Sequence, residues 1–228
     1  MSFDLALRLT EILLAFAFIQ QSAEHVIGTK NGQHVFAVRL LLSVFLLIGF
    51  ATPWIFLALA INALFILNRF QGPYNGGSDR MGILILYCLC FVHFAPNTQW
   101  QGYIFGYLAV QLVLSYFIAG WVKIMNPQWR NGRALQDVFC FSAYPVSESL
   151  RGWADKQKLL WVMSWSVMVF ELAFPLTLLT QPTLIVGLII AAIFHLANAC
   201  LFGFNRFFWA WLAAYPSIFW LQDRVLGI

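Results

Sequence analysis

LIVGLIIAAIFHLANACLFG, residues 184–203, is the stretch that decides the fold. Its only acidic or basic side chain is His195, and a helix of about twenty residues covers a hydrocarbon core of about 30 Å. Residues 102–124 and 159–179 are similarly long and apolar, with Lys123 and Glu171 as their acidic or basic side chains. The sequence therefore predicts an all-α integral membrane protein.

Composition extends this prediction to the whole chain. The 228 residues are 61% hydrophobic and 10% charged, whereas soluble proteins are about 45–50% apolar and about 25% charged. The net charge is only +4, and the basic residues are spread between apolar segments, which argues against a nucleic-acid partner. We expect the lipid bilayer as partner and one transmembrane domain, residues 1–228.

Eight apolar segments predict a polytopic bundle of about seven or eight transmembrane helices. They are residues 5–20, 35–51, 54–68, 81–95, 102–124, 159–179, 184–203 and 207–221. The first carries Arg8 and Glu11, so it fits either a span or an interfacial helix. Pro53 divides the long run of residues 35–68, which predicts a helical hairpin there.

Basic residues predict the orientation. The loops after the third, fifth and seventh helices carry Lys and Arg, whereas those after the fourth and sixth carry none. The basic residues of these loops are Arg69, Arg80, Arg130, Arg133, Arg151, Lys156, Lys158 and Arg206, and Lys30 lies in the first long loop, on the same side. By the positive-inside rule these loops face the cytoplasm, including residues 126–158, where an interfacial helix fits residues 146–156. We expect a multi-pass protein of the bacterial inner membrane.

Three ionisable residues of the spans are candidates for chemistry. A charge in hydrocarbon costs about 2.5 to more than 10 kcal/mol, so it needs a partner, a cavity or a function. Glu171 and His195 lie at similar depth, about a dozen residues from their cytoplasmic helix ends. We expect them to face each other as a proton relay, or as a packing hydrogen bond. Lys123 fits either a snorkelling lysine or a desolvated base.

The other polar residues receive simpler interpretations. Arg39 is expected to neutralise Glu11 across the first two helices, and His93 to be a wet interfacial histidine. Asp79 and Arg80 fit the lining of a cytoplasmic entrance. The cysteines, Cys88, Cys90, Cys140 and Cys200, follow no metal-ligand spacing, so we expect neither a metal site nor a disulfide.

Four short segments carry a family resemblance. They are YFIAGWVK (116–123), NPQWRNG (126–132), FHLAN (194–198) and NGGSD (75–79). Together with the helix order, they resemble the vitamin K-dependent gamma-carboxylase-like, or horizontally transferred transmembrane (HTTM), family. In the eukaryotic carboxylase, reduced vitamin K is deprotonated and reacts with oxygen to give a strong base.

The resemblance implies roles for particular residues. Lys123 matches the lysine assigned as the base that deprotonates the quinol, and His195 matches a histidine of the membrane pocket. Trp121, Trp129 and Asn198 lie in the same segments and are the expected cofactor-binding residues. The implied cofactor is a quinone.

Two main functions fit these features. The first is binding of a quinone or another lipophilic molecule near Lys123, Glu171 and His195, with redox or proton-transfer chemistry if the protein is an enzyme. The alternative is a non-catalytic accessory subunit whose helices pack against a larger membrane complex. A small transporter fits less well, because the two halves show no internal symmetry.

Overall fold

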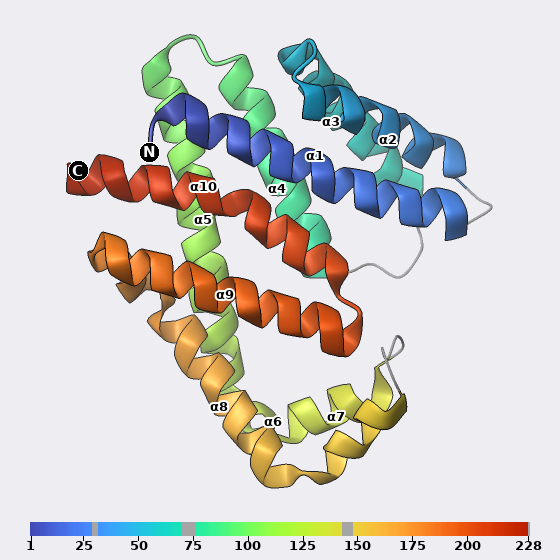
Figure 1. The fold of residues 1–228 in the computed structure, drawn as a ribbon, viewed down its shortest axis with the longest axis vertical. Coiled ribbons are helices and arrows are strands. Elements are labelled where there is room, and N and C mark those ends of the chain that lie inside the picture. The colour runs from blue at the N-terminus through green and yellow to red at the C-terminus, as the bar shows by residue number, and fades with distance from the viewer. Residues whose placement is uncertain (29–31, 70–75, 143–147, 228) are drawn as a thin grey trace. The chain divides into compact units, whose positions relative to one another are not determined.

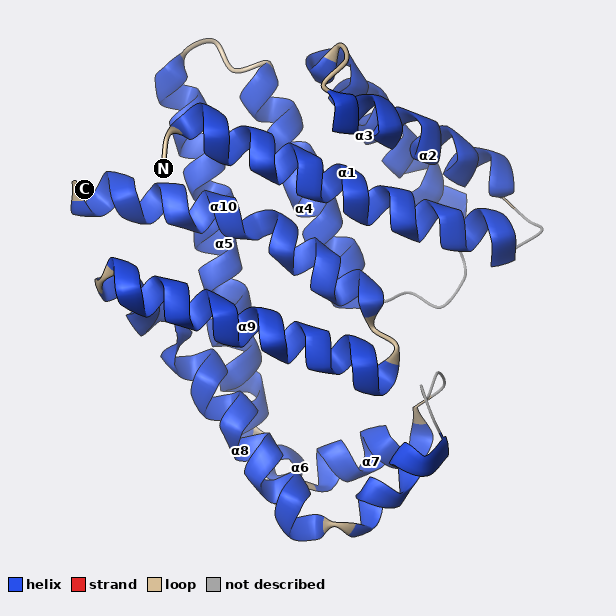
Figure 2. Ribbon diagram, viewed as in Figure 1, coloured by secondary structure: helices blue, strands red, loops and turns tan. Residues whose placement is uncertain are grey.

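The computed structural model describes residues 1–28, 32–69, 76–142 and 148–227, and every regular element in these ranges is a helix (Figure 2). The predicted all-α class is confirmed. Lys30, residue 75 of the NGGSD segment and residues 146–147 of the expected interfacial helix lie outside the described residues.

Each of the eight predicted apolar segments lies in a helix for most of its length (Figure 1), although the helices of segments 35–51 and 81–95 end earlier than predicted, at Ile48 and His93. The elements that contain them are α1 (Phe3–Gly28), α2 (Gln33–Ile48), α3 (Thr52–Arg69), α4 (Gly76–His93), α5 (Thr98–Met125), α8 (Gln157–Ala173) with the 3₁₀ helix η2 (Phe174–Leu179), α9 (Gln181–Phe202) and α10 (Asn205–Leu226). Within the described chain, three of these are long and apolar enough to cross a membrane: Thr98–Met125, Gln157–Leu179 and Gln181–Phe202. The total of seven or eight spans stays a prediction.

The predicted hairpin between α2 and α3 is confirmed. Helix α2 ends at Ile48, where Gly49 has a φ of 78° and donates its N–H to the carbonyl of Leu46. This left-handed conformation suits glycine, which has no Cβ to clash. Helix α3 then begins at Thr52, with Pro53 in its first turn, where the missing N–H costs no hydrogen bond.

The chain divides into two compact units. Unit 1 comprises Met1–Val110 and Arg206–Ile228, and unit 2 comprises Gln111–Asn205. Within unit 1, α1 packs mainly against α2, and also against α4, while α3 packs against both α2 and α4. Helices α2 and α4 can therefore supply partners for the charged residues of α1, as can α10, whose Arg206 lies 3.0 Å from Glu24.

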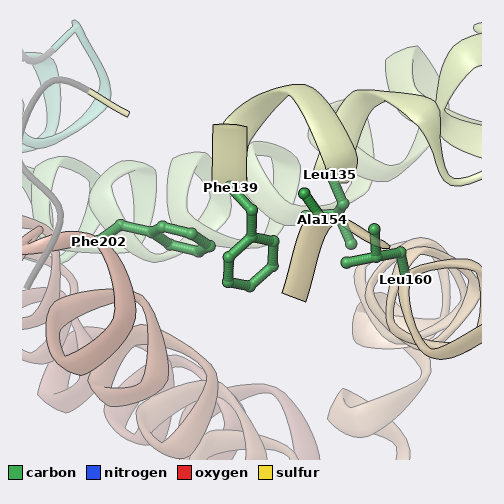
Figure 3. Close-up of a cluster of buried hydrophobic side chains, with 5 residues drawn as sticks. All are labelled: Leu135, Phe139, Ala154, Leu160 and Phe202. Carbon is green, nitrogen blue, oxygen red and sulfur yellow. The ribbon is translucent and has the colours of Figure 1, made fainter. Parts of the chain in front are cut away.

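Residues 126–158 of unit 2, which were expected to form a loop, contain three short helices in the described ranges. This segment contains α6 (Pro127–Arg130), α7 (Arg133–Phe141) and the 3₁₀ helix η1 (Glu148–Asp155). The buried side chains of α7 form a small core with η1, α8 and α9 (Figure 3). Its members are Leu135, Phe139, Ala154, Leu160 and Phe202. Helix α7 has nine residues and is too short to cross a membrane, so the hydropathy of the sequence does not predict it. Its stability comes from packing against the rest of the small core.

Candidate functional site

An ion pair joins two of the predicted residues inside unit 2. Lys123, near the end of α5, places its Nζ 2.6 Å from both carboxylate oxygens of Glu171 on α8. The Glu171 side chain is 4% exposed and that of Lys123 is 18% exposed. Charge-assisted hydrogen bonds at such distances are strong, so Lys123 contacts a buried carboxylate instead of only snorkelling to the surface.

Gly120 explains how α5 comes so close to α8 at this pair. A Cβ at Gly120 would lie 2.8 Å from the backbone nitrogen of Leu172 and 2.9 Å from the Cβ of Glu171. Real Cβ atoms almost never approach other atoms so closely, and a backbone atom cannot rotate away. The glycine of the YFIAGWVK segment therefore sets the distance between Lys123 and Glu171.

Trp129 completes the surroundings of the ammonium. The Nζ of Lys123 lies 5.2 Å from the centre of the Trp129 ring, within the range of a cation–π contact. The ring is positioned by α6, which begins after Asn126. The side-chain oxygen of Asn126 accepts a hydrogen bond from the N–H of Gln128, and Pro127 fills the first turn. The NPQWRNG segment thus fixes Trp129 beside Lys123.

His195 has a different partner from the one expected. Its Nε2 lies 2.8 Å from the hydroxyl of Tyr116, and both side chains are 2% exposed. Glu171 pairs with Lys123, so the expected Glu171–His195 contact is wrong. Similar depth in two helices does not determine which faces meet. The structure therefore forms two polar pairs, Lys123–Glu171 and Tyr116–His195, both between α5 and a later helix of unit 2.

Aromatic rings surround the Tyr116–His195 pair. The ring centre of Tyr116 lies 4.1 Å from that of Phe174 and 6.0 Å from that of Phe170. Phe194 lies against the imidazole, with ring centres 5.0 Å apart. The hydroxyl and imidazole are thus enclosed by apolar surface, where a hydrogen bond is stronger than it is in water.

Phe170 and Phe174 also line an apolar cavity of about 300 Å³. The remaining lining residues come from the end of α8, from η2 and from the start of α9. They are Ala173, Thr177, Pro182, Thr183, Val186, Gly187 and Ile190. One face of the two phenylalanines therefore borders this cavity, while the same rings contact Tyr116.

The other predicted cofactor-binding residues lie elsewhere in unit 2. Trp121 is 54% exposed and stacks on Phe117 one turn earlier in α5. Asn198 is half-buried, and its carbonyl accepts the N–H of Phe204 where α9 ends. Neither belongs to the lining of the apolar cavity. Of the three residues, only Trp129 contacts a predicted catalytic side chain.

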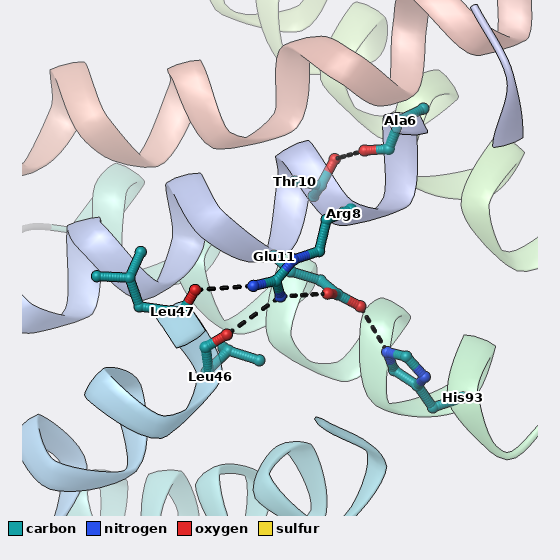
Figure 4. Close-up of polar contacts among 7 residues, drawn as sticks. All are labelled: Ala6, Arg8, Thr10, Glu11, Leu46, Leu47 and His93. Atoms are coloured by element: carbon teal, nitrogen blue, oxygen red, sulfur yellow. Dashed lines mark hydrogen bonds and ion pairs between the residues drawn. The ribbon is translucent and has the colours of Figure 1, made fainter. Parts of the chain in front are cut away.

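A second buried carboxylate lies in unit 1 and corrects two predictions (Figure 4). Glu11 accepts from Arg8 at 2.9 Å and lies 2.7 Å from His93 Nε2. The expected Arg39–Glu11 contact is wrong, because Arg39 donates to Ser22 instead. The predicted water-exposed position of His93 is also wrong, because its side chain is only 17% exposed and its ring stacks on Phe56.

The sequence assigned no role to Tyr116 and assigned Arg39 to the wrong partner. Tyr116 stands first in the YFIAGWVK segment and lies seven positions before Lys123, two helical turns away. That spacing places both side chains on one face of α5 and was a usable signal. The error for Arg39 arose because helix order alone does not show which side chains share a helix face.

Comparison with protein families gives one match. The family model of the HTTM domain matches residues 83–223, which is more than half of the chain. The comparisons with curated proteins and with solved structures found no match. The matched range contains both polar pairs of unit 2 and all three helices that can cross a membrane. This chain is therefore a membrane protein that belongs to the HTTM family.

Proposed function

We propose that unit 2 binds a quinone or a related flat lipophilic molecule, in a multi-pass protein of the bacterial inner membrane. One observation carries the proposal. The aromatic wall formed by Phe170 and Phe174 borders an apolar cavity on one side and the buried Tyr116–His195 pair on the other. An apolar pocket beside a few fixed polar groups is the usual form of a small-molecule site.

The residues present suit such a ligand. The cavity volume of about 300 Å³ is at the lower end of the usual range for ligand sites, about 300–1,000 Å³. Aromatic walls favour a flat ring through offset or edge-to-face contacts. Tyr116 and His195 do not line the cavity, so the ring of Phe170 or Phe174 must rotate before the hydroxyl and the imidazole can bind a carbonyl or hydroxyl oxygen of the ligand.

The Lys123–Glu171 pair supplies a group that can hold or accept a proton. A quinone, when bound, supplies the two-electron redox chemistry that amino-acid side chains lack. Transfer of one proton from Nζ of Lys123 to Glu171 leaves an amine beside a neutral acid. The amine is the form of lysine that acts as a base, and the pair keeps the same total charge in both forms.

Titration of the purified protein with 2-methyl-1,4-naphthoquinone tests the proposal, with tryptophan fluorescence and calorimetry as the two signals. We expect saturable binding that His195→Ala weakens about tenfold. Ile193→Ala is the matched control, because Ile193 lies on the same helix and is 60% exposed. Equal binding by wild type and His195→Ala, or binding that does not saturate, would overturn the proposal.

A non-catalytic accessory subunit remains the rival function. Unit 2 exposes large apolar side chains, such as Trp161, Val169 and Ile193, which can face lipid or a partner protein. Mass spectrometry after purification in a mild detergent separates the two functions. A stoichiometric partner together with no saturable quinone binding would favour the subunit, whereas saturable binding by the solitary protein favours the ligand site.

A further inference from the structure

Unit 1 encloses a second cavity, of about 260 Å³, that the proposed function does not use. Side chains from α1, α2, α3, α4 and α10 line it, and most of them are apolar. The apolar members include Phe18, Phe36, Ala63, Ile66, Leu67, Ile83 and Leu86. The polar members include Gln21, His25, Arg39, Asp79 and Arg206. Such a lining offers one polar region and an extensive apolar wall.

Arg39 is the unusual member of this lining. The residue is 7% exposed, and its guanidinium carbon lies 5.1 Å and 5.0 Å from the ring centres of Phe18 and Phe36. Its Nε donates to the hydroxyl of Ser22 at 2.8 Å, but its Nη2 has no hydrogen-bond partner within the described chain. A buried polar group without a partner costs about 1–3 kcal/mol, and more when it is charged.

The neighbouring charged groups do not satisfy Arg39. Arg206 binds Glu24 at 3.0 Å, and Asp79 accepts from Gln21 at 2.7 Å. Asp79 is close enough to act on Arg39 electrostatically, but among the described residues no carboxylate lies within ion-pair distance of Arg39.

His25 does not add a second positive charge. Its ring stacks on Phe36, with centres 4.1 Å apart, and is 5% exposed. Burial lowers the pKa of His25, which favours the neutral imidazole. Among the described residues, Arg39 is therefore a cation of this cavity with no carboxylate partner.

We propose that this cavity binds the anionic head group of an amphiphilic molecule, with Arg39 as the residue that binds the anion. The fork of a guanidinium matches a carboxylate or a phosphate, because two N–H groups can donate in parallel. The apolar wall accommodates a hydrocarbon chain, and its members on α3 and α4 are Ala63, Ile66, Leu67, Ile83 and Leu86. This site is made only of unit 1 residues and is separate from the residues assigned to the quinone.

Calorimetric titration of the purified protein with three ten-carbon probes tests this site. The probes are decanoate, decyl phosphate and the neutral alcohol decanol, each corrected for partitioning into protein-free detergent. We expect saturable binding of decanoate, of decyl phosphate or of both, and the stronger of the two identifies the head group. Arg39→Gln should weaken anion binding about tenfold and leave the weak decanol signal unchanged.

A second variant keeps the proposal testable if Arg39→Gln fails to fold. Asp79→Asn retains Arg39 and removes the negative charge that competes with an anion, so it should tighten anion binding about threefold or more. Arg80→Gln is the matched control, because Arg80 is exposed and does not line the cavity. Decanol binding as strong as decanoate binding, or anion binding that neither variant changes, would overturn the proposal.

Discussion

Glu11 and Glu171 are two carboxylates of equal burial in the two units, each 3% exposed, yet their partners differ. Glu11 is bound by Arg8 and His93, and Arg8 also donates to the carbonyls of Leu46 and Leu47 at the end of α2. Within the part of the chain that the structure describes, Lys123 is the residue that binds Glu171. Equal burial therefore does not imply equal function.

The chemistry of the cation makes the difference. A guanidinium does not lose its proton in proteins, so Arg8 and Glu11 remain a fixed ion pair that ties α1 to α2, while His93 ties the same carboxylate to α4. A lysine can lose its proton when it is desolvated. The Lys123–Glu171 pair can therefore exist in two proton distributions, whereas the Arg8–Glu11 pair cannot.

The largest loss of stability is expected for Glu11→Ala. This change leaves Arg8 and His93 without their shared carboxylate, and breaking a buried pair costs about 3–5 kcal/mol. The free energy of unfolding in mixed detergent, followed by circular dichroism, measures the effect. Asp4→Ala is the control, because Asp4 is an exposed carboxylate of the same helix and should change stability by less than about 0.5 kcal/mol. Similar losses in both variants would contradict a structural role for Glu11.

Gly120→Ala should have the next largest effect. The added Cβ meets the backbone of Leu172 and must push α5 from α8, at a cost of about 1–3 kcal/mol. Gly106→Ala is the matched control on α5, because its Cβ would lie 3.6 Å from Leu221 Cδ1, an ordinary contact. Alanine should there stabilise the helix by up to about 1 kcal/mol. Unfolding of both variants under the same conditions gives the comparison, and equal stability would mean that α5 and α8 separate at no cost.

Tyr116→Phe should have a smaller effect on stability. It removes the hydroxyl beside His195 and retains the ring contacts with Phe174, so the expected loss is about 0.5–1.5 kcal/mol. We also expect Tyr116→Phe to raise the dissociation constant of the naphthoquinone, because the hydroxyl is proposed to contact the ligand. Unchanged affinity with lowered stability would make the Tyr116–His195 bond purely structural.

The double substitution Lys123→Met and Glu171→Leu should change stability least. Replacing both members of a buried pair by apolar side chains of similar size is often neutral or stabilising. Any activity that depends on proton transfer should nevertheless be lost, and its pH dependence should disappear with it. A double variant that retains both would show that the two carboxylates, Glu11 and Glu171, have the same structural role.

Most of the helices could be predicted from the sequence, because an apolar segment of about twenty residues has few alternatives to a helix. Pro53 likewise marks the hairpin, because its effect on the backbone does not depend on distant contacts. Helix α7 could not be found in this way. Its nine residues are stabilised by Phe139 against Phe202 and the rest of the small core, and this packing involves residues far apart in the sequence.

The candidate site could be predicted only in part. Lys123, Glu171 and His195 were selected because they lie in apolar segments and need partners there, and the structure gives each of them a polar partner. The identity of each partner depends on how each helix is rotated about its axis and on which helices are neighbours. Hydropathy gives no information on either of these. The predicted pairing of Glu11 with Arg39 was wrong because hydropathy does not show which helix faces meet. In the structure Glu11 contacts His93, and Arg39 lines a cavity.

The contact between Glu11 and His93 also constrains the order of events during synthesis. The two residues are 82 positions apart, so the ribosome adds His93 about 4 to 16 seconds after Glu11 at the usual rates of translation. Of the two described partners of Glu11, Arg8 lies on α1 and is already present during this interval, whereas His93 is not. A nascent chain stalled before His93 should therefore leave α1 accessible to a water-soluble thiol reagent at an introduced cysteine. Stalling after His93 should protect that cysteine. This result would mean that α1 reaches its final position late, together with α4.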